Sequence, residues 1–286
     1  MQETPVFVWT KFVTDADRDF WEARLHSIED ASIVLSDTVG RRNLRIDGYC
    51  ATKKAAEALK ADFGGRVTVL KQQDWMAVSA QPKSPPLKIR DRLVISEEVT
   101  AAALKRVRDK FPGRTVVSIP VNMAFGTGHH ATTSTCLRML VDLADELPDG
   151  KWRMVDLGAG TGVLAIAARI LGAKSAVGYD FDPITVDIAR ENATNNGIDG
   201  VTFSKKDITQ WTPRGQFECI AANIFFDVLI AAFPTIHAAL KPGGHLILSG
   251  ILNTYADECL AAGEKTGLKM VRVVKRGKWV TALAVK

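Results

Sequence analysis

Residues 154–182 read MVDLGAGTGVLAIAARILGAKSAVGYDFD, and this stretch decides the fold. An apolar run ending near Asp156 is followed by glycines at 158, 160 and 162, by a helical pattern, and by a short strand that ends at Asp180. Glycines let bare backbone approach a ligand closely, and an acid at the tip of the next strand accepts hydrogen bonds from ribose hydroxyls. The pattern predicts a site for an adenine nucleoside.

The spacing of the glycines narrows the choice of ligand. A dinucleotide-binding turn has its third glycine three residues after the second, but here that position is Val163. No lysine follows the turn as it would in a phosphate-binding loop. A glycine-rich turn can also be mere punctuation, yet the strand, helix and acid around this one favour a binding site. We therefore predict S-adenosylmethionine, which carries no phosphates, as the cofactor.

Strand-like and helix-like segments alternate through the rest of the C-terminal part. This order predicts an α/β fold with a doubly wound, Rossmann-like methyltransferase sheet covered by helices on both faces. The last two strands meet at Arg276-Gly277 and are expected to form a C-terminal antiparallel hairpin. A nicotinamide-dependent dehydrogenase would share the glycine turn, but Val163 and the hairpin argue against it.

Ligands of such sheets bind at the carboxyl ends of the strands. Four polar or glycine positions fall there, namely Gly158, Asp180, Asp207 and Asn223. In this arrangement Asp180 would bind the ribose and Asp207 the adenine edge. Gly160 would lie where any side chain would fill the space of the nucleoside.

The N-terminal part has a different pattern. Its order of strands and helices is β-α-β-β-α-β, which is typical of a small ferredoxin-like α+β domain. We expect this domain over residues 1–75, a proline-containing linker over 76–100, and the methyltransferase domain over 101–286.

Composition limits the other classes of function. The 286 residues are 47% hydrophobic and 24% charged, as in ordinary globular proteins. No apolar run approaches the ~18 residues of a membrane span, and the N-terminus lacks the layout of a signal peptide. Four widely spaced cysteines without metal-ligand spacing favour a reducing cytoplasm and no metal site. We expect a cytoplasmic monomer that does not contact membranes.

The charge is unevenly distributed. Residues 1–75 carry 11 bases and 12 acids, whereas the remainder carries 26 bases and 20 acids. The basic cluster at residues 105–110 is expected to be a solvated helix face, because no basic stripe interleaved with aromatic residues accompanies it. We therefore expect no stable binding to nucleic acid.

Two further segments carry possible chemistry. Residues 123–136, MAFGTGHHATTSTC, form a turn before a helix that Thr132 or Thr133 can cap. That helix N-terminus either binds the methionine carboxylate of the cofactor or belongs to a plain capping loop. The two histidines, His129 and His130, lack partner ligands at metal spacing and are expected to be hydrogen-bonded loop residues.

The second segment is AANIFF, residues 221–226. Asn223 ends an apolar strand, where a polar residue commonly caps a turn. In the predicted sheet it would also lie beside the sulfonium methyl group. Phe225 and Phe226 would then wall a dry slot for an incoming nucleophile.

The segments AFGTGHHATT, DLGAGTGVLAIAA, GYDFDP and ANIFFDVL together resemble the PrmA family, the methyltransferases of ribosomal protein L11. The resemblance covers most of the chain, and the AFGTG segment is its specific part. It implies methylation of lysine side chains and of an N-terminal amine, with the N-terminal domain holding the substrate. It also implies cofactor contacts at Thr133, Gly158, Asp180 and Asn223.

The resemblance leaves the substrate open in part, because this chain departs from the family's pattern. The family usually has proline before its Thr-Thr pair, where this chain has Ala131. Methylation of lysines in another protein, or of RNA, are the alternatives. For an amine substrate, alignment with the sulfonium methyl would supply most of the catalysis. No dedicated base is apparent, and Asn223 is assigned the role of orienting the amine.

Overall fold

The computed structural model describes residues 6–14, 17, 21, 24–25, 31–37, 43–50, 52–70, 84–122 and 124–286. The chain divides into two compact units, Met1–Pro82 and Lys83–Lys286. Trp75 and most of the first predicted helix lie outside the described residues.

The first unit contains a four-stranded antiparallel sheet in the order β2-β3-β1-β4. Its described elements are β1 Val6–Thr14, β2 Ser32–Asp37, β3 Asn43–Cys50, α2 Lys53–Phe63 and β4 Arg66–Leu70. Trp9, Leu44 and Ile46 are buried between the sheet and α2 with Leu59. The strand order agrees with the expected α+β pattern, and the ferredoxin-like assignment stays a prediction because its first helix is not described.

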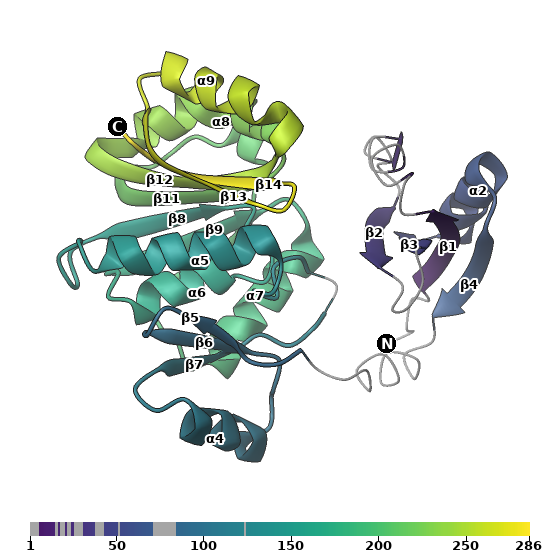
Figure 1. The fold of residues 1–286 in the computed structure, drawn as a ribbon, viewed down its shortest axis with the longest axis horizontal. Coiled ribbons are helices and arrows are strands. Elements are labelled where there is room, and N and C mark those ends of the chain that lie inside the picture. Colours follow the sequence, from purple (N-terminus) through teal and green to yellow (C-terminus); the bar gives the residue numbers. More distant parts are fainter. Residues whose placement is uncertain are drawn as a thin grey trace. The chain divides into compact units, whose positions relative to one another are not determined.

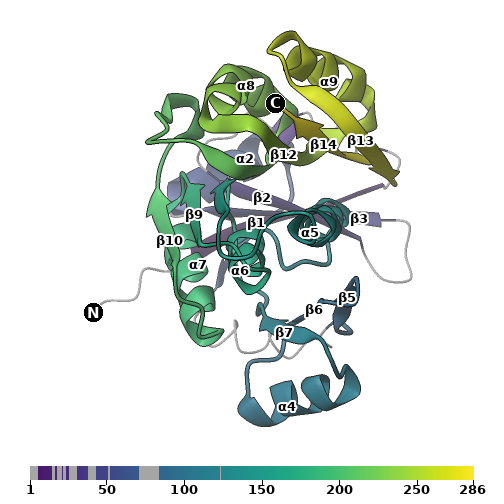
Figure 2. The same ribbon diagram turned by 90° about the vertical axis from the view of Figure 1, so that its left-hand side faces the viewer.

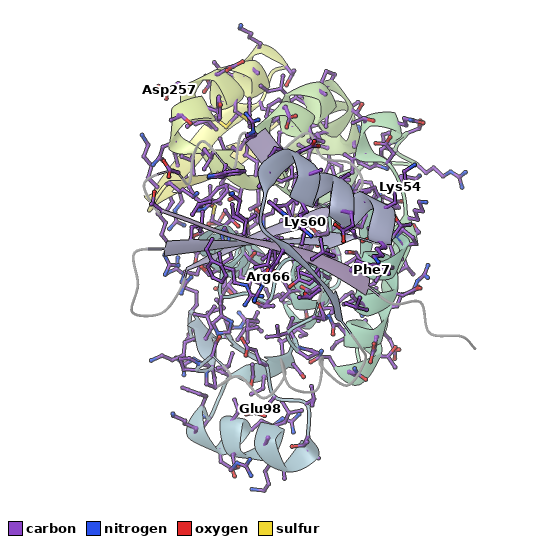
Figure 3. The ribbon with its side chains drawn as sticks, turned by 90° about the vertical axis from the view of Figure 1, so that its right-hand side faces the viewer. Phe7, Lys54, Lys60, Arg66, Glu98 and Asp257 are labelled. Carbon is purple, nitrogen blue, oxygen red and sulfur yellow. The ribbon has the colours of Figure 1, made fainter. Side chains whose placement is uncertain are left out.

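Basic side chains lie on the surface of this first unit. Lys54 and Lys60 project from α2, and Arg66 begins β4 (Figure 3). All three are exposed.

The second unit is built on a seven-stranded sheet in the order β10-β9-β8-β11-β12-β14-β13 (Figure 1). Its strands are β8 Arg153–Leu157, β9 Ser175–Asp180, β10 Val201–Lys205, β11 Phe217–Asn223, β12 Leu240–Leu252, β13 Lys269–Arg276 and β14 Trp279–Val285. The first five in spatial order are parallel, and β14 pairs antiparallel with both β12 and β13. The predicted α/β fold and its terminal hairpin are therefore confirmed.

Helices cover both faces of this sheet (Figure 1). One face packs against α5 Ala131–Ala144, α6 Val163–Ile170 and α7 Pro183–Asn195. The opposite face packs against α8 Phe226–Ala239 and α9 Ala256–Lys265. Residues Val163–Ala168 of α6 are all buried, as expected for a helix that is apolar all round. Two short 3-10 helices, η2 Ile208–Gln210 and η3 Asn253–Tyr255, follow β10 and β12.

A small three-stranded sheet precedes α5 (Figure 2). It contains β5 Leu87–Ile89, β6 Leu93–Ser96 and β7 Thr115–Ser118, with α4 Ala101–Lys110 connecting the parallel pair β6 and β7. β5 and β6 thus occupy part of the range 76–100 that was expected to be a linker. The basic residues of α4 lie on its exposed side, as predicted.

Candidate cofactor and active site

The order of the strands in the seven-stranded sheet indicates where a ligand binds. From β8 the chain moves outward through β9 and β10, and then returns to β11 on the other side of β8. The direction reverses between β8 and β11, and ligands of open α/β sheets bind at such a switch point. The turn Gly158–Gly162 follows β8, and Asn223 ends β11. The predicted residues Gly158, Gly160 and Asn223 therefore flank the switch point.

Asp180 is tied to the glycine turn. Its carboxylate accepts hydrogen bonds from the amide of Gly160 at 3.0 Å and from the amide of Asp182 at 3.2 Å. Burial raises the pKa of Asp180, while these amide donors act in the opposite direction. Asp182 in turn caps α7 by accepting from the amide of Ile184, with Pro183 at the first helical position.

The glycines of the turn are required by the protein's own packing. Gly158, Gly160 and Gly162 have φ values of 73°, 54° and 79°, which L side chains rarely adopt. A Cβ on Gly160 would lie 2.3 Å from the carbonyl oxygen of Phe125, and one on Gly158 would lie 2.3 Å from a methyl carbon of Ile224. The missing side chain of Gly160 therefore makes room for a neighbouring loop, and the predicted space for the nucleoside stays a prediction.

That neighbouring loop is the AFGTG segment. The amide of Thr161 donates to the carbonyl of Phe125 at 2.9 Å, and the hydroxyl of Thr161 donates to the carbonyl of Gly126 at 2.6 Å. Both acceptors lie 35 or more residues earlier in the chain. The glycine turn and the AFGTG segment therefore form one rigid cradle.

The cap of α5 differs from the expectation. His130, and neither Thr132 nor Thr133, is the N-cap residue, and its Nδ1 lies 2.7 Å from the hydroxyl of Thr132. Its ring also lies between the rings of Phe125 and Trp279, with centroids 5.1 and 5.2 Å away. Burial and the charge of Lys278 lower the pKa of His130. A neutral imidazole therefore lines the edge of the cradle at physiological pH.

Thr133 and Asn223 meet although they are 90 residues apart in the chain. The amide nitrogen of Asn223 donates to the hydroxyl of Thr133 at 3.4 Å. Thr133 is buried in the first turn of α5. The side-chain oxygen of Asn223 is buried and has no hydrogen-bond partner among the described residues. Thr133 thus orients the amide, and the side-chain oxygen of Asn223 is a buried acceptor without a donor from the described residues.

Asp156 is a second buried polar group, and no side chain among the described residues pairs with it. It is 1% exposed, and neither carboxylate oxygen has a hydrogen-bond partner within the described residues. Burial raises the pKa of Asp156 to about 7, the backbone amide of Ala165 acts in the opposite direction, and the charge of Asp180 adds to the increase. Burying an ionised carboxylate without a charge partner is costly, so a cation near the glycine turn would stabilise the ionised form of Asp156. S-adenosylmethionine has both an ammonium and a sulfonium group, and the residues present fit it.

Asp207 stands apart from the other predicted site residues. It is the N-cap of η2, and its carboxylate accepts from the amide and hydroxyl of Thr209 and from the side chain of Gln210. These hydrogen bonds lower the pKa of Asp207. No described contact joins it to Asp180 or the glycine turn, so its contact with adenine stays a prediction.

Phe225 and Phe226, which follow β11, do not form a closed slot in the structure. Phe225 is 59% exposed at the N-cap of α8. Phe226 stacks on Tyr255 with ring centroids 4.1 Å apart and planes 4° from parallel. Tyr255 was not identified from the sequence, because it comes from η3 and meets Phe226 only through the pairing of β11 with β12.

His129 lies in a separate group of contacts. One ring nitrogen lies 3.0 Å from the carbonyl of Pro85, and the other lies 3.6 Å from a carboxylate oxygen of Glu97. Glu97 is buried and also accepts from the amide of Ser84 at 2.9 Å. The prediction of a hydrogen-bonded loop histidine is confirmed for His129. No cluster of three or more potential metal ligands occurs in the part of the chain that the structure describes.

Comparison with known proteins identifies the family of this chain. The profile of the family described as ribosomal protein L11 methyltransferase (PrmA) matches residues 14–286. A ribosomal protein L11 methyltransferase of Rhizobium meliloti is 34% identical over 275 residues, which cover 93% of this chain and 85% of that protein. Another, from Desulforapulum autotrophicum, is 35% identical over 241 residues, covering 82% of this chain and 75% of that protein.

A solved structure shares the fold. The crystal structure of a ribosomal protein L11 methylase from Lactobacillus delbrueckii subsp. bulgaricus superimposes with a TM-score of 0.60 at 25% identity. The match covers 70% of this chain and 98% of that one. With the cradle, the buried carboxylates and a matched profile over nearly the whole sequence, the chain belongs to the ribosomal protein L11 methyltransferase (PrmA) family and is an S-adenosylmethionine-dependent methyltransferase.

Proposed function

We propose that this protein methylates amines of ribosomal protein L11, at lysine side chains, at the N-terminus, or at both. The observation that carries the proposal is the contact between the AFGTG segment and the glycine turn through Thr161. This segment is the specific part of the family's pattern, and here it forms one wall of the cradle. The relatives described above are named as methyltransferases of ribosomal protein L11. The match to the Rhizobium meliloti protein extends over 93% of this chain.

The cofactor contacts proposed here follow from the cradle. Asp180 would hold the ribose, Asp207 the adenine edge, and the backbone at Gly158 and Gly160 would face the nucleoside. Thr133 and Asn223 would lie nearest the reacting end. When bound, S-adenosylmethionine supplies an electrophilic methyl group.

The main task of the protein is to receive a neutral amine. With an ordinary lysine pKa of ~10.4, about one amine in ~2,500 is neutral at pH 7, which corresponds to ~4.6 kcal/mol. The aromatic surface of Phe125, His130 and Phe225 lowers the polarity around an incoming lysine, and a less polar environment disfavours its ammonium form. The neutral imidazole of His130 adds no charge of its own.

Asn223 is proposed to align the amine. Its side-chain oxygen is the acceptor that lacks a partner, and Thr133 fixes the amide plane. An N–H of the amine donated to this oxygen would direct the nitrogen lone pair toward the methyl group. Alignment of this kind accounts for a large share of catalysis when no dedicated base takes part.

We further propose that the N-terminal unit, predicted as residues 1–75, holds the protein substrate and that residues 76–100 connect it to the methyltransferase unit. We also propose a cytoplasmic monomer that forms no stable complex with nucleic acid. No helix among the described residues is both long and apolar enough to cross a bilayer.

The test is a methylation assay with purified components. Ribosomal protein L11 and labelled S-adenosylmethionine are incubated with the enzyme, and methylated positions are mapped by mass spectrometry. Methylated lysines or a methylated N-terminus are expected. Incubation of a cell extract forms the second arm: label on a different protein or on RNA, with ribosomal protein L11 unlabelled, would replace the proposed substrate.

A further inference from the structure

Helix α5 presents a stripe of polar side chains along one face. Ser134, Arg138, Asp142 and Asp145 are spaced by four, four and three residues, so they lie one above another on the helix. The stripe begins at Ser134 in the first turn of α5. Arg276 bonds to Ser134 and pairs with Trp279, whose ring lies against His130 at the edge of the cradle. The stripe therefore runs outward from the proposed site of methyl transfer.

A bulge in β13 places arginines beside this stripe. Met270 pairs with Ala284, and the next pairing joins Arg272 to Leu283, so one residue is extra on β13. The extra residue turns Arg272 from the face of α9, where Met270 packs, to the face of α5. Arg276 then lies on the same side as Arg272, four residues along.

The carboxylate of Asp142 offsets the positive charges of Arg90 and Arg272. It accepts two hydrogen bonds from Arg90, at 2.7 and 2.6 Å, and one from Arg272 at 2.7 Å. Partial burial tends to raise the pKa of Asp142, but these two guanidinium groups outweigh it and hold the pKa below its ordinary value. Arg90 comes from the turn after β5, so one carboxylate joins three elements.

One helical turn closer to the active site, the corresponding carboxylate is missing. Arg138 occupies the position on α5, and Arg276 is its neighbour from β13. Arg138 donates to the carbonyl of Ser134 at 2.8 Å, and Arg276 donates to the hydroxyl of Ser134 at 2.8 Å. Among the described residues neither guanidinium has a carboxylate partner. Burial and the charges of Arg276 and Arg90 lower the pKa of Arg138, as expected for like charges held together.

We propose that Arg138 and Arg276 form a binding site for a carboxylate of the protein substrate, from an aspartate, a glutamate or a chain terminus. The inference rests on the proposed function, since it assumes a protein substrate at the neighbouring active site. Asp142 between Arg90 and Arg272 is the template for the geometry, because a planar carboxylate accepts from two guanidinium groups at once. The site selects among amines by requiring an acid near the one to be methylated.

The other explanation for cations on β13 covers only part of them. β13 is the edge strand, and charged residues on edges discourage pairing with other sheets. Lys275 fits this role on the side of α9. Arg276 is instead hydrogen-bonded toward α5 and held next to Arg138, which edge protection does not require.

The experiment measures steady-state methylation of ribosomal protein L11 by the full-length enzyme and by Arg138→Gln, Arg276→Gln and the double variant. Each single change is expected to raise KM for the protein substrate at least about fivefold, with kcat at saturation and affinity for S-adenosylhomocysteine unchanged. Arg276→Lys keeps the charge but loses the planar fork, and is expected to recover only part of the affinity. Lys275→Gln, on the same strand but the other face, is the matched control and is expected to behave as wild type.

Three results would overturn the proposal. KM could be unchanged in the double variant, or it could rise equally in Lys275→Gln, which would indicate unspecific attraction. Alternatively, the double variant could lose retention on RNA while methylating protein normally, and the site would then bind phosphate.

A separate arm distinguishes failure of this site from failure of the proposed function. The side-chain Nε signals of Arg138 and Arg276 are followed by NMR while sodium acetate is added, with sodium chloride at equal ionic strength as the control. Saturable shifts with acetate alone support the carboxylate site even if ribosomal protein L11 is not methylated. Equal responses to both salts overturn the site, whatever the substrate.

Discussion

The amide of Thr161 donates a hydrogen bond to the carbonyl of Phe125, with 2.9 Å between nitrogen and oxygen. This bond joins the glycine turn after β8 to the AFGTG segment before α5. It depends on Gly160, because a Cβ there would lie 2.3 Å from the same carbonyl oxygen. The proposed cofactor cradle therefore depends on the contact between these two backbones.

Replacing Gly160 by alanine should disrupt the cradle. The substitution adds a backbone clash to the cost of a left-handed residue, which is about 1–2 kcal/mol. Gly197→Ala is the matched control, because Gly197 has φ of 65° and no atom within 4 Å of its Cβ position. Urea denaturation should show a clearly larger loss for Gly160→Ala, together with weaker binding of S-adenosylhomocysteine. Equal losses in both variants would mean that the AFGTG segment is not seated on the turn.

Asp180 should matter to the cofactor more than Asp207 does. Asp180→Asn removes the negative charge and one of two acceptors for backbone amides, each charge-assisted bond being worth ~1.5–3 kcal/mol. Affinity for S-adenosylhomocysteine by calorimetry should fall at least about tenfold. Asp207→Ala should have a smaller effect, since its carboxylate is engaged within η2. The assignment of Asp180 to the ribose would be abandoned if Asp180→Asn bound with wild-type affinity.

Asp156 should make the stability of the free protein depend on pH. Its pKa in the folded state is about 7, against ~3.9 in the unfolded chain. The folded state therefore holds the proton more tightly, and the free energy of unfolding falls as pH rises from ~4 to ~7, by up to ~1.4 kcal/mol per pH unit. Asp156→Asn is neutral throughout and should lack this contribution.

Urea denaturation of both proteins between pH 4 and pH 8 measures this effect. The difference in stability should grow in favour of Asp156→Asn up to about pH 7 and then stay constant. Asp180, whose pKa is also raised, is present in both proteins and cancels to first order. Parallel curves would show that Asp156 has a partner that keeps it ionised.

Asn223 should affect turnover more than binding. Asn223→Ala removes the acceptor proposed to align the amine, so kcat should fall at least about tenfold, with a smaller change in cofactor affinity. Asn253→Ala is the control, because its side chain is exposed and donates to the carbonyl of Gly277. Steady-state kinetics with each substrate varied in turn separates the two effects. A loss confined to KM for the cofactor would leave Asn223 as a binding residue without a role in alignment.

Local sequence patterns predicted the part of the fold that depends on local interactions. The run from β8 through α6 to β9 follows from apolar strands, spaced glycines and a buried helix within 30 residues. β5 was missed because three residues after Pro85-Pro86 are too few to show a period, and only pairing with β6 makes them a strand.

The site was predicted less completely, because its decisive contacts join distant segments. The packing of Phe125 against Gly160, the cap at His130 and the stack of Phe226 on Tyr255 depend on pairings that no single segment encodes. Asp156 was visible as a polar residue in an apolar strand. Its lack of partners could be recognised only once its surroundings were known.

We expect the second unit to bind the cofactor in the absence of the first unit. A fragment of residues 83–286 corresponds to the second unit and contains all the proposed cofactor residues. It should begin no later than residue 83, because the amide of Ser84 and the carbonyl of Pro85 bind Glu97 and His129. The fragment should fold and bind S-adenosylhomocysteine nearly as well as the whole chain.

Methylation of ribosomal protein L11 by this fragment should nevertheless collapse, because the proposed capture surface is gone and the amine is no longer delivered in line. A fragment beginning at residue 87 serves as a comparison: without the bond from Ser84, Glu97 stays buried with one partner fewer, and stability should fall. Calorimetry, circular dichroism and the methylation assay on both fragments decide the matter. Wild-type activity of the fragment on the intact substrate would assign the N-terminal unit another task, since the cradle alone would then suffice to select the amine.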